Sequence, residues 1–208
     1  MDPLSQPRSP RHGELLERAY DYVLEHGLST LSLRPLAAAI GSSPRVLLFL
    51  FGSKDGLVRA LLRRARADEL AFVAELRDRD AEADLRTVIA ATWAWLAHPL
   101  HRPVLRLWAD AYAQSLTQPD GPWRDFAAGT VADWLGVLAS AQPEKTRESE
   151  TATAERTLAL AVLRGALLDL LATSDVARTS AAIERHLETL GATSGRARAG
   201  GSAGRRRP

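Results

Sequence analysis

Hydrophobic positions recur with a helical period along almost the whole chain. Apolar residues repeat at intervals of three and four from Leu85 to Leu96 and again from Trp123 to Leu138, and this spacing places them on one side of a helix. No segment shows the sustained alternation of apolar and polar residues that marks a half-buried strand. The chain is therefore predicted to be all-α, with a small N-terminal helical domain and a larger helical body.

The segment from residue 31 to residue 54 predicts two short helices followed at once by a long one. Ser32 stands where it can cap the first helix, and Gly41 supplies the backbone freedom that ends it. Ser43 can cap the second helix, with Pro44 pre-set at its first helical position. This arrangement is a helix-turn-helix, which puts the end of a helix into the major groove of DNA.

The same segment resembles the DNA-binding domain of the tetracycline-repressor (TetR) family of bacterial regulators. The resemblance covers about the first third of the chain and requires spacing as well as residue type to agree. It implies a DNA-binding domain over residues 9–69, with the helix-turn-helix at about 31–50, and a helical ligand-binding and dimerisation domain over residues 70–191. The matching positions are Ser32, Ala37, Gly41, Ser43, Phe51, Ser53, Lys54 and Leu57.

The second short helix departs from the family pattern. Leu48 stands where the family usually has a tyrosine, and no charged side chain occurs from Val46 to Phe51. Gly56 occupies a position that is often acidic in the family. Base readout is therefore expected to depend on Arg45, helped by Ser43 and by apolar contacts with thymine methyl groups. The predicted DNA-contacting residues are Ser32, Arg34, Ser43, Pro44, Arg45, Phe49 and Lys54.

All five tryptophans lie between Trp93 and Trp134. One interpretation is that they fill the core of a helical bundle, and the other is that several of them line a cavity for a small molecule. The resemblance implies the second, because the corresponding helices line the inducer pocket in TetR-like proteins. A flat or apolar effector of unknown identity is expected. The predicted lining residues are Trp93, Leu96, Trp108, Tyr112, Trp123, Phe126 and Trp134.

The last two predicted helices have the pattern of an interface. The first is apolar nearly all round from Leu158 to Leu171, and the second carries a narrow apolar seam that ends at Leu190. An intrachain core explains either pattern alone, but the resemblance implies a homodimer that reads an inverted repeat in double-stranded DNA. The predicted interface residues are Leu163, Leu167, Leu170, Ile183, Leu187 and Leu190.

Composition limits the remaining possibilities. The chain has no cysteine, and its formal net charge of +2 depends on five arginines after residue 191, so the pI is no sign of a basic DNA-binding body. Residues 192–208 are rich in Gly, Ala, Ser and Arg and are predicted to form a disordered tail. The first residues show no secretory signal, and a cytoplasmic protein with no membrane partner is expected.

No arrangement of residues calls for catalysis. His98 and His101 have the spacing of a metal pair, but Pro99 breaks the helix between them and no carboxylate is suitably placed. No catalytic residue, metal or cofactor is therefore predicted. The leading hypothesis is a dimeric, ligand-responsive transcriptional regulator, most simply a repressor. The alternatives are a helical small-molecule-binding protein whose helix-turn-helix no longer reads DNA and, less favoured, a helical enzyme that uses the same pocket.

Overall fold

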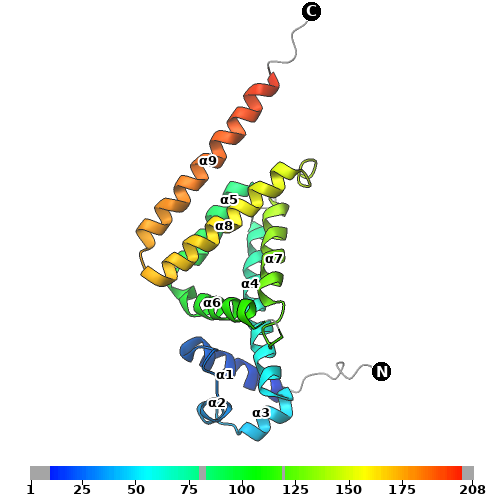
Figure 1. Cartoon of the computed structure of the whole chain (residues 1–208), viewed down its shortest axis with the longest axis vertical. Helices are drawn as coiled ribbons and strands as arrows, with labels where there is room; N and C mark the ends of the chain where they lie inside the picture. The colour runs from blue at the N-terminus through cyan, green and yellow to red at the C-terminus, as the bar shows by residue number, and fades with distance from the viewer. Residues whose placement is uncertain (1–9, 80–82, 119, 203–208) are drawn as a thin grey trace, which may run out of the picture. The chain divides into compact units, whose positions relative to one another are not determined.

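The computed structural model describes residues 10–79, 83–118 and 120–202. In these ranges all regular elements are helical and no strand is present, which confirms the all-α prediction (Figure 1). The elements are α1 (Pro10–His26), α2 (Leu33–Ala39), α3 (Pro44–Phe51), α4 (Lys54–Arg79), α5 (Leu85–Ala97), the short 3-10 helix η1 (Pro99–His101), α6 (Arg102–Thr117), α7 (Phe126–Ser140), α8 (Glu150–Thr173) and α9 (Val176–Ser202).

The chain forms two compact units. The first comprises the chain up to Phe72 together with Pro103–Thr130, and the second comprises Val73–Arg102 together with the chain from Val131. The helices α4 and α7 each contribute to both units. This division differs from a single boundary at residue 69, because the middle of the chain returns to the N-terminal helices.

The buried cluster of the first unit explains that return. Leu47 of α3, Leu107 and Ala111 of α6, and Phe126 of α7 all belong to it. Burial of apolar surface is the dominant favourable contribution to folding. The helix-turn-helix is therefore stabilised by residues that follow it at a long distance in the sequence, and not by α1 and α4 alone.

A polar cluster joins α1 to α4 at the edge of this core. The Tyr20 hydroxyl donates a hydrogen bond to Asp68 over 2.9 Å, and the Arg64 guanidinium binds Glu17 over 2.8 Å and also pairs with Asp68. The guanidinium lies 4.8 Å from the centre of the Tyr20 ring. Burial, reinforced by the neighbouring Asp68 carboxylate, raises the pKa of Tyr20, so the hydroxyl stays protonated and able to donate.

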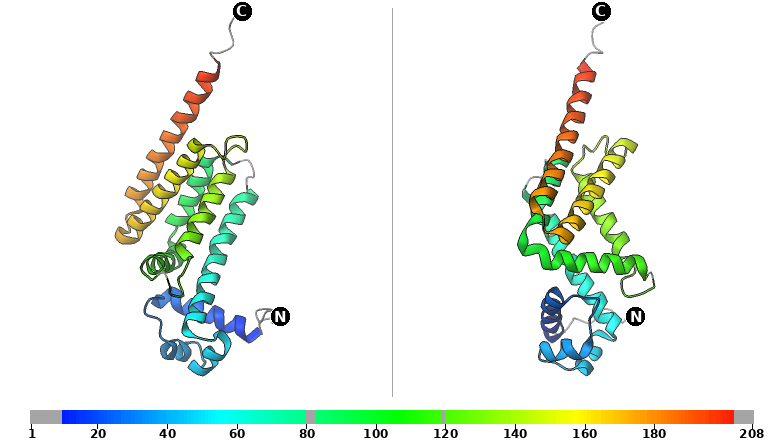
Figure 2. Two further views of the ribbon diagram at one scale, coloured as in Figure 1. Left: turned by 45° about the vertical axis from the view of Figure 1, so that its right-hand side comes forward. Right: turned by 60° about the vertical axis from the view of Figure 1, so that its left-hand side comes forward.

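The second unit is built on mutual packing of α5, α8 and α9 (Figure 2). Trp93 of α5 is buried, and its indole N–H donates to the Ser180 hydroxyl of α9 over 3.0 Å. Arg102 donates to the carbonyl oxygen of Leu170, near the C-terminus of α8, over 3.1 Å. These bonds satisfy polar groups that would otherwise be costly to bury.

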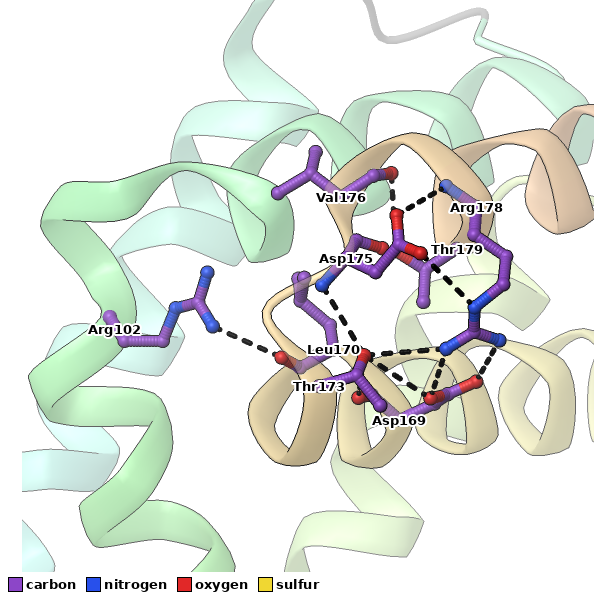
Figure 3. A network of polar contacts seen from close by, with 8 residues as sticks. All are labelled: Arg102, Asp169, Leu170, Thr173, Asp175, Val176, Arg178 and Thr179. Atoms are coloured by element: carbon purple, nitrogen blue, oxygen red, sulfur yellow. Dashed lines mark hydrogen bonds and ion pairs between the residues drawn. The ribbon is translucent and has the colours of Figure 1, made fainter.

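An ion-pair network fixes the turn between α8 and α9 (Figure 3). The Arg178 guanidinium donates to both carboxylate oxygens of Asp169, over 2.6 and 2.7 Å, and Asp175 accepts from the Arg178 backbone N–H at the start of α9. Ser174 adopts a left-handed conformation with φ 58°, and its N–H donates to the Leu170 carbonyl. Two parallel hydrogen bonds from the Arg178 guanidinium to the Asp169 carboxylate therefore hold the hairpin. Arginine is the residue best suited to this bidentate geometry.

The helix α9 continues to Ser202, past the start of the predicted disordered tail. Lengthening an existing helix needs no new nucleus. Alanine and arginine in this segment favour helix, whereas Gly195, Gly200 and Gly201 oppose it. The arginines at 205, 206 and 207 lie outside the described residues, so disorder of the final segment stays a prediction.

Candidate DNA-binding and ligand-binding surfaces

The helices α2 and α3 form the predicted helix-turn-helix. Their axes are bent by 102° across a short break, within the range of about 90–120° that is typical of this motif. Gly41 has φ 66° in the turn, a left-handed conformation that glycine adopts at no steric cost. The Ser42 N–H donates to the Ala37 carbonyl over 2.8 Å and closes the turn.

Local contacts fix the start and the end of α3. The Ser43 hydroxyl accepts a hydrogen bond from the Val46 N–H over 3.3 Å, and Pro44 occupies the first turn, as the sequence predicts. Gly52 ends the helix with φ 78°, and its N–H donates to the Leu48 carbonyl over 2.8 Å. These contacts give α3 a defined direction relative to the core of the first unit.

The outward side of α3 combines one charged and two apolar side chains. Leu47 is buried in the core, whereas Phe49 is 85% exposed and Leu48 is 41% exposed. Arg45 is also exposed and lies one helical turn before Phe49, so the two share a face of the helix. Arg45 and Phe49 are therefore available together for contact with a partner.

The other predicted DNA-contacting residues are also at the surface. Ser32, Arg34 and Lys54 are exposed, and Ser43 is exposed beside the partly buried Pro44. One detail differs from the sequence prediction: Ser32 is the N-cap residue of α2, but its side chain makes no capping hydrogen bond. The Ser32 hydroxyl therefore contributes no cap to α2.

The predicted ligand-binding residues divide between the two units. Trp93, Leu96 and Trp134 are buried in the second unit. In the first unit, Trp123 and Phe126 are buried, and the rings of Trp108 and Tyr112 are in contact at a centroid distance of 5.0 Å. The indole N–H of Trp93 is already engaged in its hydrogen bond to the Ser180 hydroxyl. Neither unit by itself brings all seven residues together, and the aromatic pocket stays a prediction.

Most of the residues predicted to form a dimer interface have side chains that are buried within their own chain. Leu163, Leu167 and Leu170 of α8 and Ile183 and Leu187 of α9 are each at most 9% exposed, and α8 and α9 pack on each other and on α5. The helix α5 of the same chain therefore covers much of this apolar seam, and a role of these residues in a dimer interface stays a prediction. Leu190, at the end of the seam, is partly buried.

A different side of α8 is exposed and apolar. Leu158 is 55% exposed and Leu168 is 52% exposed, and a side chain added at Gly165 would meet no atom within 4 Å. The exposed residues repeat at intervals of four, three, four and three, which places them along one side of the helix. We name this surface the α8 stripe. It consists of Ala154, Leu158, Ala161, Gly165 and Leu168.

The two neighbouring histidines make structural contacts. His101 Nδ1 is 2.8 Å from the Trp95 carbonyl oxygen, and its ring stacks on the Trp95 indole. His98 Nδ1 accepts from the Leu100 N–H over 3.3 Å. In the part of the chain that the structure describes, no group of three His, Cys, Asp or Glu residues is placed to hold a metal ion.

Within the ranges that the structure describes, no single helix is both long enough and apolar enough to cross a membrane. Only taken together do α2 and α3 have the length and composition of such a span, and a bend of 102° separates them.

The chain is similar in sequence to HTH-type transcriptional regulators. No protein-family model matches the chain. The HTH-type transcriptional regulator BetI of Burkholderia thailandensis is 30% identical over 115 residues, which are 54% of this chain and 58% of that protein. The chain thus spans less than two thirds of the length of the curated relatives that it matches.

Solved structures extend the similarity to most of the chain. A TetR transcription regulator from Haloarcula marismortui superimposes with a TM-score of 0.71 at 16% identity, covering 86% of this chain and 96% of the other. The multidrug binding protein EbrR, solved with proflavin, has a TM-score of 0.64 at 25% identity, covering 85% of this chain and 99% of the other. The chain has the TetR-family fold. The resemblance recognised in the sequence is thereby confirmed.

The local packing of this chain explains one departure from the family pattern. The Ser53 hydroxyl accepts a hydrogen bond from the Gly56 N–H over 2.9 Å at the start of α4. A Cβ atom at position 56 would overlap the carbonyl oxygen of Phe51. In this chain the end of α3 therefore approaches α4 so closely that only glycine fits. The sequence showed the departure, but the close approach that requires it was visible only in the structure.

Proposed function

We propose that the chain is a ligand-responsive transcriptional regulator that binds an inverted-repeat operator as a homodimer, and that it acts as a repressor. The observation that carries the proposal is the outward side of α3, where Arg45 and Phe49 stand exposed in a helix-turn-helix of the TetR-family fold. The regulator BetI among the sequence relatives supports the same function.

The proposed contacts follow from exposure and chemistry. The Arg45 guanidinium donates to base edges in the major groove, where guanine N7 and O6 are its usual acceptors. Phe49 and Leu48 supply apolar contact to thymine methyl groups, while Ser43 adds a hydroxyl. Ser32, Arg34 and Lys54 hold the phosphate backbone, which fixes position and adds affinity without sequence information. Pro44 gives the helix its entry direction.

We propose the α8 stripe as the surface that joins two copies of the chain. Its alternating spacing matches a helix that packs against a second helix, and the small residues Ala161 and Gly165 at its centre allow close approach of two backbones. Two copies related by a two-fold axis would place the same residues on both sides of the interface. A dimer is also what an inverted-repeat operator requires, because one short helix reads too few base pairs.

We propose that a small-molecule effector controls the DNA-bound state. EbrR, a multidrug binding protein of the same fold, was solved with proflavin, which is consistent with a flat aromatic effector for the predicted tryptophan-lined pocket. The helix α4 starts at Lys54 and passes through both units without a break. A ligand that favours one position of α4 would therefore change DNA affinity by its differential affinity for the two states.

In vitro selection of random duplex DNA on the purified protein, at near-physiological salt, tests this function. Enrichment of an inverted repeat is the expected result, and Arg45→Ala, processed in parallel, should enrich a repeat that is degenerate at one base pair in each half-site. If a folded dimer enriches no sequence, either the helix-turn-helix does not read DNA and the chain is a small-molecule-binding protein, or DNA binding requires the effector, and repeating the selection with candidate effectors distinguishes the two.

A further inference from the structure

The exposed side of α8 consists of uncharged residues over most of the helix. From Thr151 to Ala172, all within the described part of the chain, the exposed residues are threonines, alanines, leucines and one glycine. The side of a helix that faces water is ordinarily rich in charged residues, whereas the core of a protein interface is depleted of them. This side of α8 therefore has the composition of a covered surface.

Large and small residues follow one another along the α8 stripe in an order that complements its own reverse. When a second α8 runs in the opposite direction with Ala161 facing Ala161, Leu168 lies opposite Ala154. In the same register Leu158 lies opposite Gly165 to within one residue. Each leucine thus faces a residue small enough to receive it, as ridges fill grooves between packed helices. In a parallel pair the leucines would face each other, so the stripe complements itself in the antiparallel direction only.

A groove lies on α8 at the place where this register puts Leu168 of the second copy. Ala154, Leu158 and Ala161 line it with two neighbouring threonines, so the groove follows the N-terminal half of the stripe. On the other half, Leu168 projects and is 52% exposed. One helix therefore carries both a projecting side chain and a groove that can receive it. An interface between two identical chains needs this pairing, because when residue i contacts j, residue j also contacts i.

Hydrogen bonds hold the groove in shape at the start of α8. Gln142 is 5% exposed, and its side-chain amide donates to the Ala152 carbonyl over 2.9 Å and accepts from Arg156 over 3.2 Å. Arg156 also donates to the Arg147 carbonyl over 2.6 Å. These bonds tie the segment before α8, which contributes Glu148 to the groove, to the first turns of the helix. Because the groove is already formed in the single chain, filling it needs little additional ordering.

We propose that two copies of the chain pack α8 against α8 in antiparallel directions about Ala161, with Leu168 of each copy inserted into the groove around Ala154 of the other. Each groove is completed only by the second copy. The register rests on the proposed function, which requires a dimer, and adds to it the direction of the two helices and the residues that meet. DNA binding is not needed for the two chains to pair.

An exchange of the large and the small residue tests which positions meet. Sedimentation equilibrium of the full chain without DNA gives the dimer dissociation constant. Leu168→Ala should raise this constant about tenfold or more, because two leucines lose their burial on association. Ala154→Leu should also raise it, since two leucines then compete for one groove. The double variant A154L/L168A should lie closer to the wild type than either single variant, as expected of two residues in contact. Leu116→Ala is the matched control, since Leu116 is 66% exposed on α6 in the first unit.

Cysteine cross-linking tests the direction of the helices, and the chain has no cysteine of its own. Under mild oxidation Ala161→Cys should form a covalent dimer, because position 161 faces itself. Leu168→Cys alone should stay uncrosslinked, since the two copies of position 168 lie about 20 Å apart along the helices, beyond the Cα separation of about 4–7 Å that a disulfide spans. A mixture of the Ala154→Cys and Leu168→Cys chains should form a covalent dimer that neither chain forms alone.

Each other outcome overturns the proposal. A monomeric wild-type chain removes the interface, and a cross-link of Leu168→Cys to itself shows a different direction or register. A double variant no stronger than the weaker single variant shows that positions 154 and 168 do not meet. Equal weakening by Leu116→Ala shows a general effect of lost apolar surface. Circular dichroism of each variant verifies that it is folded. A dimer of another register that still enriches an inverted repeat leaves the proposed regulator intact, so the two failures are separate results.

Discussion

Two helices of this chain, α3 and α8, expose large apolar side chains, but in opposite surroundings. On α3 the exposed Phe49 and Leu48 stand within one turn of the charged Arg45. On α8 the exposed Leu158 and Leu168 are separated by small residues and extend along the helix in a regular stripe. The surface of α3 therefore offers a few isolated apolar contacts, whereas the α8 stripe offers a continuous apolar strip.

The difference shows how exposed apolar residues separate into two kinds of interface. A charged and hydroxylated surface with a few apolar tips suits DNA, where phosphate contacts position the protein and base edges specify the sequence. A strip of alternating large and small residues suits another helix, because ridges on one helix fill grooves on the other. Substitutions on the two surfaces are therefore expected to change different properties of the molecule.

Ala161→Glu should have the largest effect, because it places a charge at the centre of the α8 stripe. An unpaired buried charge costs about 3–5 kcal/mol, which raises the dimer dissociation constant more than a hundredfold. Sedimentation equilibrium over a range of protein concentrations measures the change. Ala94→Glu is the control, because Ala94 is exposed on α5 of the same unit. A dimer of unchanged stability in Ala161→Glu would place the interface elsewhere.

Gly56→Ala should come next, because it forces apart the end of α3 and the start of α4. Overpacking typically costs about 1–3 kcal/mol of unfolding free energy, and the upper part of that range is expected here, because the obstacle is the Phe51 backbone carbonyl and not a flexible side chain. Urea denaturation gives the value. Gly136→Ala, on α7, is the control, since an added Cβ there meets no atom within 4 Å and alanine should stabilise the helix. Similar stabilities for the two variants would contradict the close approach at position 56.

Arg45→Ala tests the specificity of α3. Loss of a paired hydrogen bond to a base should cost about 1–3 kcal/mol of operator binding and relax the preference at one position in each half-site. Fluorescence anisotropy with the selected operator, and with versions mutated at single base pairs, measures both effects. An unchanged preference would show that Phe49, Leu48 and DNA shape carry the readout.

Lys54→Ala should instead weaken binding to all sequences alike. Lys54 is exposed at the start of α4, and removing its ion pair with a DNA phosphate should lower the slope of log affinity against log salt by about 1. Titrations at several salt concentrations with operator and unrelated DNA distinguish the two roles. A weakening confined to the operator would assign Lys54 to base readout.

The residues that start and end the N-terminal helices were predicted well from the sequence. The Ser43 cap, Pro44 in the first turn and the left-handed Gly41 are local features, set by residues within a few positions of one another. The sequence also indicated the helical period of nearly every later segment. Local chemistry is what single-sequence patterns record most directly, and the helix-turn-helix consists mainly of such chemistry.

The long-range features were less accessible to prediction. The helix α8 is apolar nearly all round, so the spacing of its apolar residues does not show which side packs against its own chain. For this reason the interface was predicted on Leu163 and Leu167, which are buried. The spacing of the α8 stripe was present in the sequence, but only packing against α5 and α9 shows that this side is left exposed. The return of α6 to the first unit likewise depends on contacts between residues far apart in the chain.

The smallest expected effect concerns the turn between α8 and α9, where no exposed apolar surface is involved. Hydrogen bonds from Arg178 lower the pKa of Asp169, so the ion pair stabilises the fold fully above the ordinary carboxyl pKa of about 4, and this stabilisation is lost as the pH falls through the lowered value. Arg178→Gln should return the pKa of Asp169 toward its ordinary value, as followed by NMR titration of the side-chain carboxyl carbon. Arg185→Gln, which removes a separate surface pair with Glu188, should leave that titration unchanged. Because this ion pair lies at the surface, with side chains 52% and 39% exposed, either substitution should leave the proposed dimer and its DNA binding intact. A monomeric Arg178→Gln variant would show that the hairpin turn, and not the α8 stripe alone, determines assembly.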